Sequence, residues 1–157
     1  MRIVIADHDP DARGQLGWIL AEDGHEVTAV EDGAAAWEVL RQPGAPWLSI
    51  LDWVMPGLDG AEVCRLVRGL GGSHWAYLLL AAAPEEADDV VAGLACGADD
   101  FVAKPYERAD VRARLRVGCR MLALRQKLTQ RVRELEAALA RVNQLQVLLP
   151  MCCYCKK

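Results

Sequence analysis

The sequence predicts an α/β fold in which helices cover both faces of a parallel sheet. Five short apolar runs alternate with segments of helical length and period, and the runs are almost continuously apolar. Strands of this kind are typical of parallel sheets that are buried on both faces. With 157 residues and 53% hydrophobic content, the chain can form one domain with a substantial core and an appendage.

The elements follow from the change of hydrophobic period along the chain. The expected strands are Ile3–Ala6, Glu26–Val30, Leu48–Leu51, Tyr77–Ala81 and Phe101–Ala103. The expected helices lie near residues 10–22, 33–41, 59–69 and 86–95. A last helix is expected from Glu107 onward, because no proline intervenes before Pro150.

Composition excludes several classes of protein. No stretch of 18 or more apolar residues occurs, so neither a membrane span nor a signal peptide is predicted, and we expect a cytoplasmic protein. In that compartment the six cysteines stay reduced, with Cys64, Cys96 and Cys119 expected as small hydrophobic residues of helices. Charge is uneven: residues 1–104 hold 18 acidic and 6 basic side chains, whereas residues 105–157 hold 4 and 12.

Charged residues follow three of the expected strands. Asp7, His8 and Asp9 come after the first strand, Asp52 after the third and Lys104 after the fifth. Ligands of open parallel sheets bind at the carboxyl ends of the strands, beside the point where the strand order reverses. We therefore predict that these side chains form one functional site.

These residues and their neighbours resemble the receiver domain of two-component response regulators. The resemblance covers about residues 1–120 and includes Asp7, Asp52, Met55-Pro56, Asp59-Gly60, Gly97-Ala98-Asp99-Asp100 and Lys104-Pro105. It implies a flavodoxin-like, doubly wound (βα)5 sheet with a cis Lys104-Pro105 bond. It also implies a signalling module, with no enzyme activity of its own, that works with a sensor histidine kinase or phosphotransfer protein.

The resemblance gives each site residue a role. Asp52 would accept the phosphoryl group and Lys104 would neutralise phosphoryl oxygens, in keeping with the charge that develops in phosphoryl transfer. Mg²⁺ would be held by Asp7, Asp52, the backbone carbonyl of Val54 and the residue at position 8. The turn after Asp52, between Gly57 and Gly60, would let the backbone pass close to the ligand.

Two positions depart from the family pattern. His8 stands where the family normally has a second acidic ligand, and imidazole suits transition metals better than Mg²⁺, so weak or absent Mg²⁺ binding is predicted. A further reading has Asp7 and Asp9 supply the oxygens from either side. Ala81 replaces the Thr or Ser whose hydroxyl links phosphorylation to the switch face, and Phe101 takes the place of the switch aromatic. A degenerate receiver that acts as a dimeric scaffold without phosphorylation is therefore an alternative function.

The C-terminal part predicts a coiled coil that joins two copies of the chain as a parallel dimer. Residues spaced by four and three form a seam: Leu128, Val132, Leu135, Leu139, Val142, Gln146 and Leu149. We expect a receiver domain over residues 1–121, a coiled-coil helix over 122–149 and a tail over 150–157. The arginines from Arg108 to Arg133 are expected to be solvated or to serve self-association, and nucleic-acid binding is not expected. Cys152 and Cys155 have the spacing of one cysteine pair of a tetrahedral zinc site, which is half of its ligands.

Overall fold

The computed structural model describes the backbone of residues 1–71, 76–83 and 95–153, and side chains as far as residue 144. Most of the helix expected near residues 86–95, and the residues from 154 to the end of the chain, including Cys155, lie outside the described residues. The chain divides into two compact units, residues 1–119 and 120–157.

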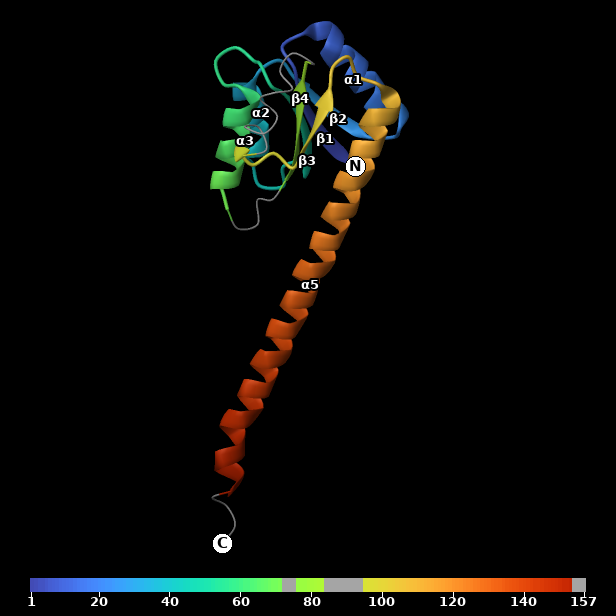
Figure 1. The fold of residues 1–157 in the computed structure, drawn as a ribbon. Coiled ribbons are helices and arrows are strands. Elements are labelled where there is room, and N and C mark those ends of the chain that lie inside the picture. The colour runs from blue at the N-terminus through green and yellow to red at the C-terminus, as the bar shows by residue number, and fades with distance from the viewer. Residues whose placement is uncertain (72–75, 84–94, 154–157) are drawn as a thin grey trace. The chain divides into compact units, whose positions relative to one another are not determined.

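The first unit is built on a sheet of five parallel strands (Figure 1). The strands are β1 (Arg2–Ala6), β2 (Glu26–Val30), β3 (Leu48–Asp52), β4 (Tyr77–Ala82) and β5 (Asp100–Ala103). Their order is β2-β1-β3-β4-β5, so the direction of winding reverses between β1 and β3. This is the flavodoxin-like order, and it confirms the predicted fold class.

Helices cover both faces of the sheet. They are α1 (Pro10–Glu22), α2 (Gly33–Leu40), α3 (Gly60–Gly69) and α5 (Arg108–Cys153). Figure 1 shows α2 and α3 together on one face, with α1 and the first turns of α5 on the other. The first three helices begin after aspartate caps, Asp9, Asp32 and Asp59, whose side chains accept backbone N–H groups of the first turn.

The core lies on both faces because successive strand residues point in opposite directions. Val4 of β1 packs with Leu51, Val63 and Val67 on the side of α2 and α3. All residues of β3 and β4 are buried. This double burial explains why the strands read as continuous apolar runs in the sequence.

Helix α5 begins close to the sheet. Gly118 allows this approach, because a Cβ atom at its position would lie 2.7 Å from the Tyr77 ring and 3.1 Å from Leu48. The helix continues past Pro150 to Cys153, beyond the residue at which a separate tail was expected to begin. Among the described residues, no helix is long and apolar enough to cross a membrane.

Candidate functional site

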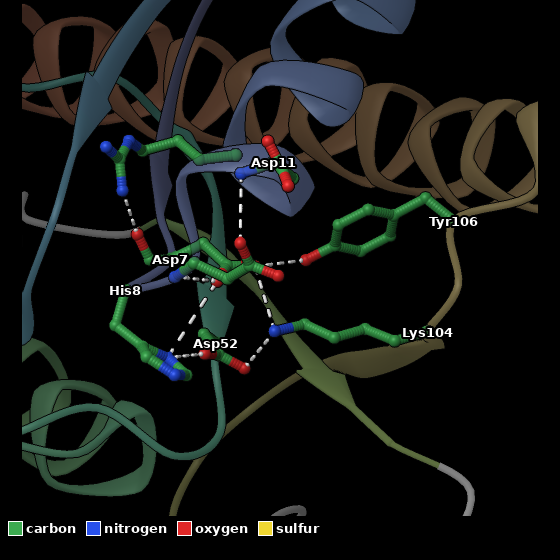
Figure 2. Close-up of polar contacts among 8 residues, drawn as sticks. Asp7, His8, Asp11, Asp52, Lys104 and Tyr106 are labelled. Atoms are coloured by element: carbon green, nitrogen blue, oxygen red, sulfur yellow. Dashed lines mark hydrogen bonds and ion pairs between the residues drawn. The ribbon is translucent and has the colours of Figure 1, made fainter.

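The carboxyl ends of β1, β3 and β5 bring Asp7, Asp52 and Lys104 together (Figure 2). The Lys104 ammonium lies 2.6 Å from Oδ1 of Asp52 and 2.9 Å from Oδ2 of Asp7. Both carboxylates are buried, with 3% of Asp52 and none of Asp7 exposed. One cation therefore bridges two buried acids, as the position of these residues after their strands predicted.

Burial and hydrogen bonding shift the pKa of Asp52 in opposite directions. Burial favours the neutral acid and the charge of Asp7 acts in the same sense, so the pKa of Asp52 is raised. Hydrogen bonds from Lys104 and His8 to the carboxylate limit that rise. The ionised form of Asp52 thus depends on the hydrogen bonds that Lys104 and His8 supply and on the charge of Lys104.

Lys104 stays charged despite its position. Burial alone would lower its pKa, but hydrogen bonds to Asp52 and Asp7 outweigh that effect and raise the pKa above its ordinary value. Its backbone N–H donates to the Ala82 carbonyl at 2.8 Å, which continues the sheet past β5. The Lys104-Pro105 bond is cis, as the resemblance implied.

His8 contacts the other oxygen of Asp52. Its Nδ1 atom lies 2.8 Å from Oδ2 of Asp52 and 3.9 Å from Oδ1 of Asp7. Both oxygens of Asp52 therefore have a nitrogen partner, Lys104 on Oδ1 and His8 on Oδ2. The His8 side chain is 49% exposed, so the protein surrounds the imidazole ring on one side only.

Tyr106 is a site residue that the sequence did not reveal. It is buried, and its hydroxyl donates to Oδ2 of Asp7 at 3.0 Å (Figure 2). Burial raises its pKa, and the charge of Asp7 raises it further, so the hydroxyl remains a donor. An aromatic residue after Lys104-Pro105 gives no signal that its hydroxyl reaches back to β1.

The turns next to β1 tie down the backbone of Asp7. The N–H of Asp9 donates to Oδ1 of Asp7 at 3.0 Å, and Nη1 of Arg13 donates to the Asp7 carbonyl at 2.6 Å. The Asp9 carboxylate accepts the N–H of Asp11 at 2.9 Å, as the cap of α1. The Asp9 carboxylate thus serves as the helix cap through one of its oxygens, and the reading in which Asp9 supplies an oxygen ligand beside Asp7 stays a prediction.

Asp7, His8 and Asp52 also form a group that could hold a cation. One ligand atom from each lies within 4.8 Å of the other two. Two carboxylates suit a hard divalent cation such as Mg²⁺, whereas the imidazole nitrogen suits softer metals. The three side chains therefore fit a divalent cation. The His8 nitrogen makes the site less suited to Mg²⁺ than an oxygen ligand at that position would. Val54 lies two residues beyond Asp52 with an exposed side chain, and its carbonyl as a ligand stays a prediction.

The loop after β3 is held close to Asp52. Gly57 adopts a positive φ of 80°, which favours glycine. A Cβ atom on Gly60 would lie 2.3 Å from the Asp52 carbonyl oxygen, so no larger residue fits there. Asp59 and Glu62 form a capping box that starts α3 at this point. The Asp59-Gly60 pair thus brings a helix start against the backbone of the site.

The two switch positions lie on β4 and β5. Ala81 is fully buried, pairs with Asp52 across the sheet, and accepts the Trp53 N–H at 2.7 Å. Its methyl group has no hydrogen to donate toward Asp52. Phe101 is partly buried, and the Arg114 guanidinium lies 5.2 Å from the centre of its ring.

Comparison with known proteins identifies the family. Residues 3–116 match the model of the response regulator receiver domain. The chain belongs to this family. Receiver domains of response regulators act in two-component signalling, and they bind Mg²⁺ at an acidic site.

Similar proteins and structures agree with this assignment. The chain is 36% identical over 117 residues to response regulator RppA of Synechocystis, covering 74% of this chain and 49% of RppA. It is 34% identical over 119 residues to the DNA-binding response regulator MtrA of Mycolicibacterium smegmatis, covering 76% and 50%. It thus spans about half the length of these relatives.

Among solved structures, one similar chain is the receiver domain of the sensor histidine kinase PA1611 from Pseudomonas aeruginosa. That structure has a magnesium ion in its active site cleft. The TM-score is 0.66 at 25% identity, covering 74% of this chain and 95% of that one. Full-length FixJ from B. japonicum matches with a TM-score of 0.68 at 26% identity, covering 76% and 57%.

Replacing Tyr106 with Phe tests its contact with Asp7. The variant keeps the ring but leaves one oxygen of a buried carboxylate without its hydroxyl donor, so we expect the free energy of unfolding to fall by about 1–3 kcal/mol. Urea denaturation followed by circular dichroism measures this. Tyr77→Phe is the control: that tyrosine is equally buried, and its hydroxyl has no hydrogen-bond partner among the described residues. Equal losses in both variants would show that the contact contributes nothing.

Proposed function

We propose that the chain is a receiver module that accepts a phosphoryl group on Asp52. The observation that carries this proposal is the position of the Lys104 ammonium. It lies 2.6 Å from one oxygen of the buried Asp52 carboxylate and 2.9 Å from the neighbouring acid Asp7. The proposed donor is a phosphohistidine of a sensor kinase or phosphotransfer protein. Family membership over residues 3–116 supports both statements.

The proposed nucleophile is Oδ2 of Asp52. Its partner His8 is half exposed and can rotate into water, whereas Lys104 is 19% exposed and held by two carboxylates. Oδ2 attacks phosphorus, the phosphorus–nitrogen bond of the phosphohistidine breaks, and the departing imidazole takes a proton from water. Lys104 stays near Asp52 and balances charge on the phosphoryl oxygens.

A divalent cation in this site would be held by Asp7, Asp52 and the Val54 carbonyl, with His8 at the remaining position. When bound, the cation supplies positive charge to the phosphoryl oxygens. We propose that His8 makes Mg²⁺ binding weaker than in an all-oxygen site, because its nitrogen is a poor Mg²⁺ ligand and brings no negative charge.

The output of this module is proposed to run through protein contacts and a dimer. The exposed seam from Leu128 to Val142 supports self-association through residues 120–149. The arginines at the start of α5 are already paired: Arg114 lies 2.6 Å from Asp100, and Arg112 donates to Asp23 at 2.7 Å. These ion pairs support the prediction that this stretch does not bind nucleic acid.

A scaffold that works without phosphorylation is the second candidate function. Two observations favour it: both oxygens of Asp52 have nitrogen partners from the chain itself, and Ala81 brings no hydroxyl to the site. In that case the contacts of Lys104 and His8 would serve only to stabilise buried acids, and the dimer would be the functional unit.

Intact mass spectrometry separates the two functions. After incubation with acetyl phosphate and either Mg²⁺ or Mn²⁺, we expect wild type to gain the mass of one phosphoryl group, because the Asp52 carboxylate beside Lys104 is the proposed acceptor. Asp52→Asn should gain none, and hydroxylamine should remove the wild-type adduct, as expected of an acyl phosphate. An unmodified wild type under both metals would favour the scaffold.

Titration with Mg²⁺ tests the role of His8. Trp53 adjoins Asp52 and reports the site by fluorescence, with Trp53→Phe identifying its share of the signal. We expect His8→Asp to tighten Mg²⁺ binding by about tenfold or more, because it adds an oxygen and a negative charge. His8→Asn, which adds a neutral oxygen, should fall between the two. Equal affinities in all three proteins would place residue 8 outside the coordination sphere.

The missing hydroxyl is tested at Ala81. Phe101 is the only phenylalanine of the chain, so selective labelling gives a single NMR probe of the switch position. With beryllium trifluoride and Mg²⁺, we expect Ala81→Thr to shift the Phe101 resonance more than wild type does, because threonine donates a hydrogen bond. Ala81→Val has the same shape without the hydroxyl and should behave as wild type. A full response in wild type would show that the hydroxyl is not needed.

A further inference from the structure

The second unit exposes a stripe of large apolar side chains along α5. Leu128, Leu135 and Leu139 are 65%, 65% and 63% exposed, and Val132 and Val142 are 45% and 49% exposed. They are spaced by four, three, four and three residues, which keeps them on one side of the helix. Such a stripe is stable in water when another helix covers it.

The order of residues in the stripe fits a pair of parallel helices. In heptad positions, Val132 and Leu139 are at a, and Leu128, Leu135 and Val142 are at d. Leucine at d with a β-branched residue at a favours two parallel strands; Leu128, Val132 and Leu135 follow that rule, whereas Leu139 at a and Val142 at d do not. A second copy of this chain offers the same stripe and is the simplest occupant.

Charges beside the stripe select one alignment of the two helices. Arg131 is at a g position, and Glu136 is at the e position five residues later. In a parallel pair without offset, each g residue faces the e residue five positions later on the other helix. Arg131 of each copy then faces Glu136 of the other, which gives two ion pairs by symmetry.

Other alignments lose both ion pairs. In an antiparallel pair, g positions face g positions, and the other described g residues, Leu124 and Ala138, carry no charge. A parallel pair shifted by one heptad would bring Arg131 against Thr129 or Asn143, which are also uncharged. Charge complementarity therefore exists in one arrangement only among those compared.

Arg131 is free to change partner. In the single chain its Nη1 lies 2.8 Å from Glu134 of the same helix, with 78% of the arginine side chain exposed. Exposed pairs of this kind contribute little to stability, so exchange for a partner at the helix interface costs little.

We infer that α5 forms a parallel, unshifted two-stranded coiled coil with a second copy of this chain, aligned by Arg131 of each copy against Glu136 of the other. This inference rests on the dimer proposed above and adds the alignment of its two helices. It places the two receiver units at the same end of the dimer.

Charge reversal on the full chain tests the inference by analytical ultracentrifugation. Arg131→Glu alone and Glu136→Arg alone each place like charges face to face, so the dimer dissociation constant should rise by about tenfold. Mixing the two variants, or combining both changes in one chain, should restore wild-type affinity. Arg133→Glu, at an outward b position, is the control and should leave affinity unchanged.

The outcomes separate the alignment from the dimer itself. A wild-type chain that stays monomeric at high concentration would overturn the dimer and the inference together. A wild-type dimer whose affinity is the same in Arg131→Glu, Glu136→Arg and Arg133→Glu would overturn the alignment and leave the dimer standing. Recovery in the mixture supports the inference, because a simple loss of helix stability would not be reversed by a second variant.

Discussion

The bridge from Lys104 to two buried carboxylates is the interaction on which the site depends. Asp7 and Asp52 lie at the ends of neighbouring strands with almost no exposure to water. Two such acids repel each other and lose hydration, and an unpaired buried charge is strongly destabilising. Lys104 contacts both carboxylates, and its positive charge offsets part of the cost of burying them. A phosphoryl group on Asp52 would enter a site whose positive charge is already in place.

His8, Tyr106 and Ala81 set the surroundings of the same two carboxylates, Asp7 and Asp52. His8 lies 2.8 Å from the Asp52 oxygen that Lys104 does not contact. A half-exposed imidazole therefore stands at the position where the family pattern has a second acidic ligand. Tyr106 adds a hydroxyl to Asp7, which lessens the dependence of that carboxylate on a cation. On the other side of Asp52, Ala81 contributes only a methyl group. The site gives the resting carboxylates several hydrogen-bond partners, and we propose that it senses a phosphoryl group only weakly.

Much of this could be predicted from the sequence, for physical reasons. The strands were predictable because burial on both faces requires continuous apolar runs, and Asp52 and Lys104 because parallel strands deliver their ends to one edge. The role of Tyr106 was not predictable. Its contact with Asp7 joins residues 99 positions apart, and the direction of its side chain does not follow from any hydrophobic period of the sequence. Asp9 illustrates the opposite case: a helix cap and a metal ligand need the same residue type, and only the structure shows that the Asp9 carboxylate accepts the Asp11 N–H as the cap of α1.

Mapping the modified residue tests the central claim most directly. Borohydride reduction converts an aspartyl phosphate to homoserine, which peptide mass spectrometry locates in the sequence. Lys104 and His8 converge on one carboxylate, so homoserine should appear at position 52 of protein treated with acetyl phosphate and at no other aspartate. Homoserine at Asp7, Asp9 or Asp59, with Asp52 unchanged, would contradict the assignment of Asp52 as the acceptor.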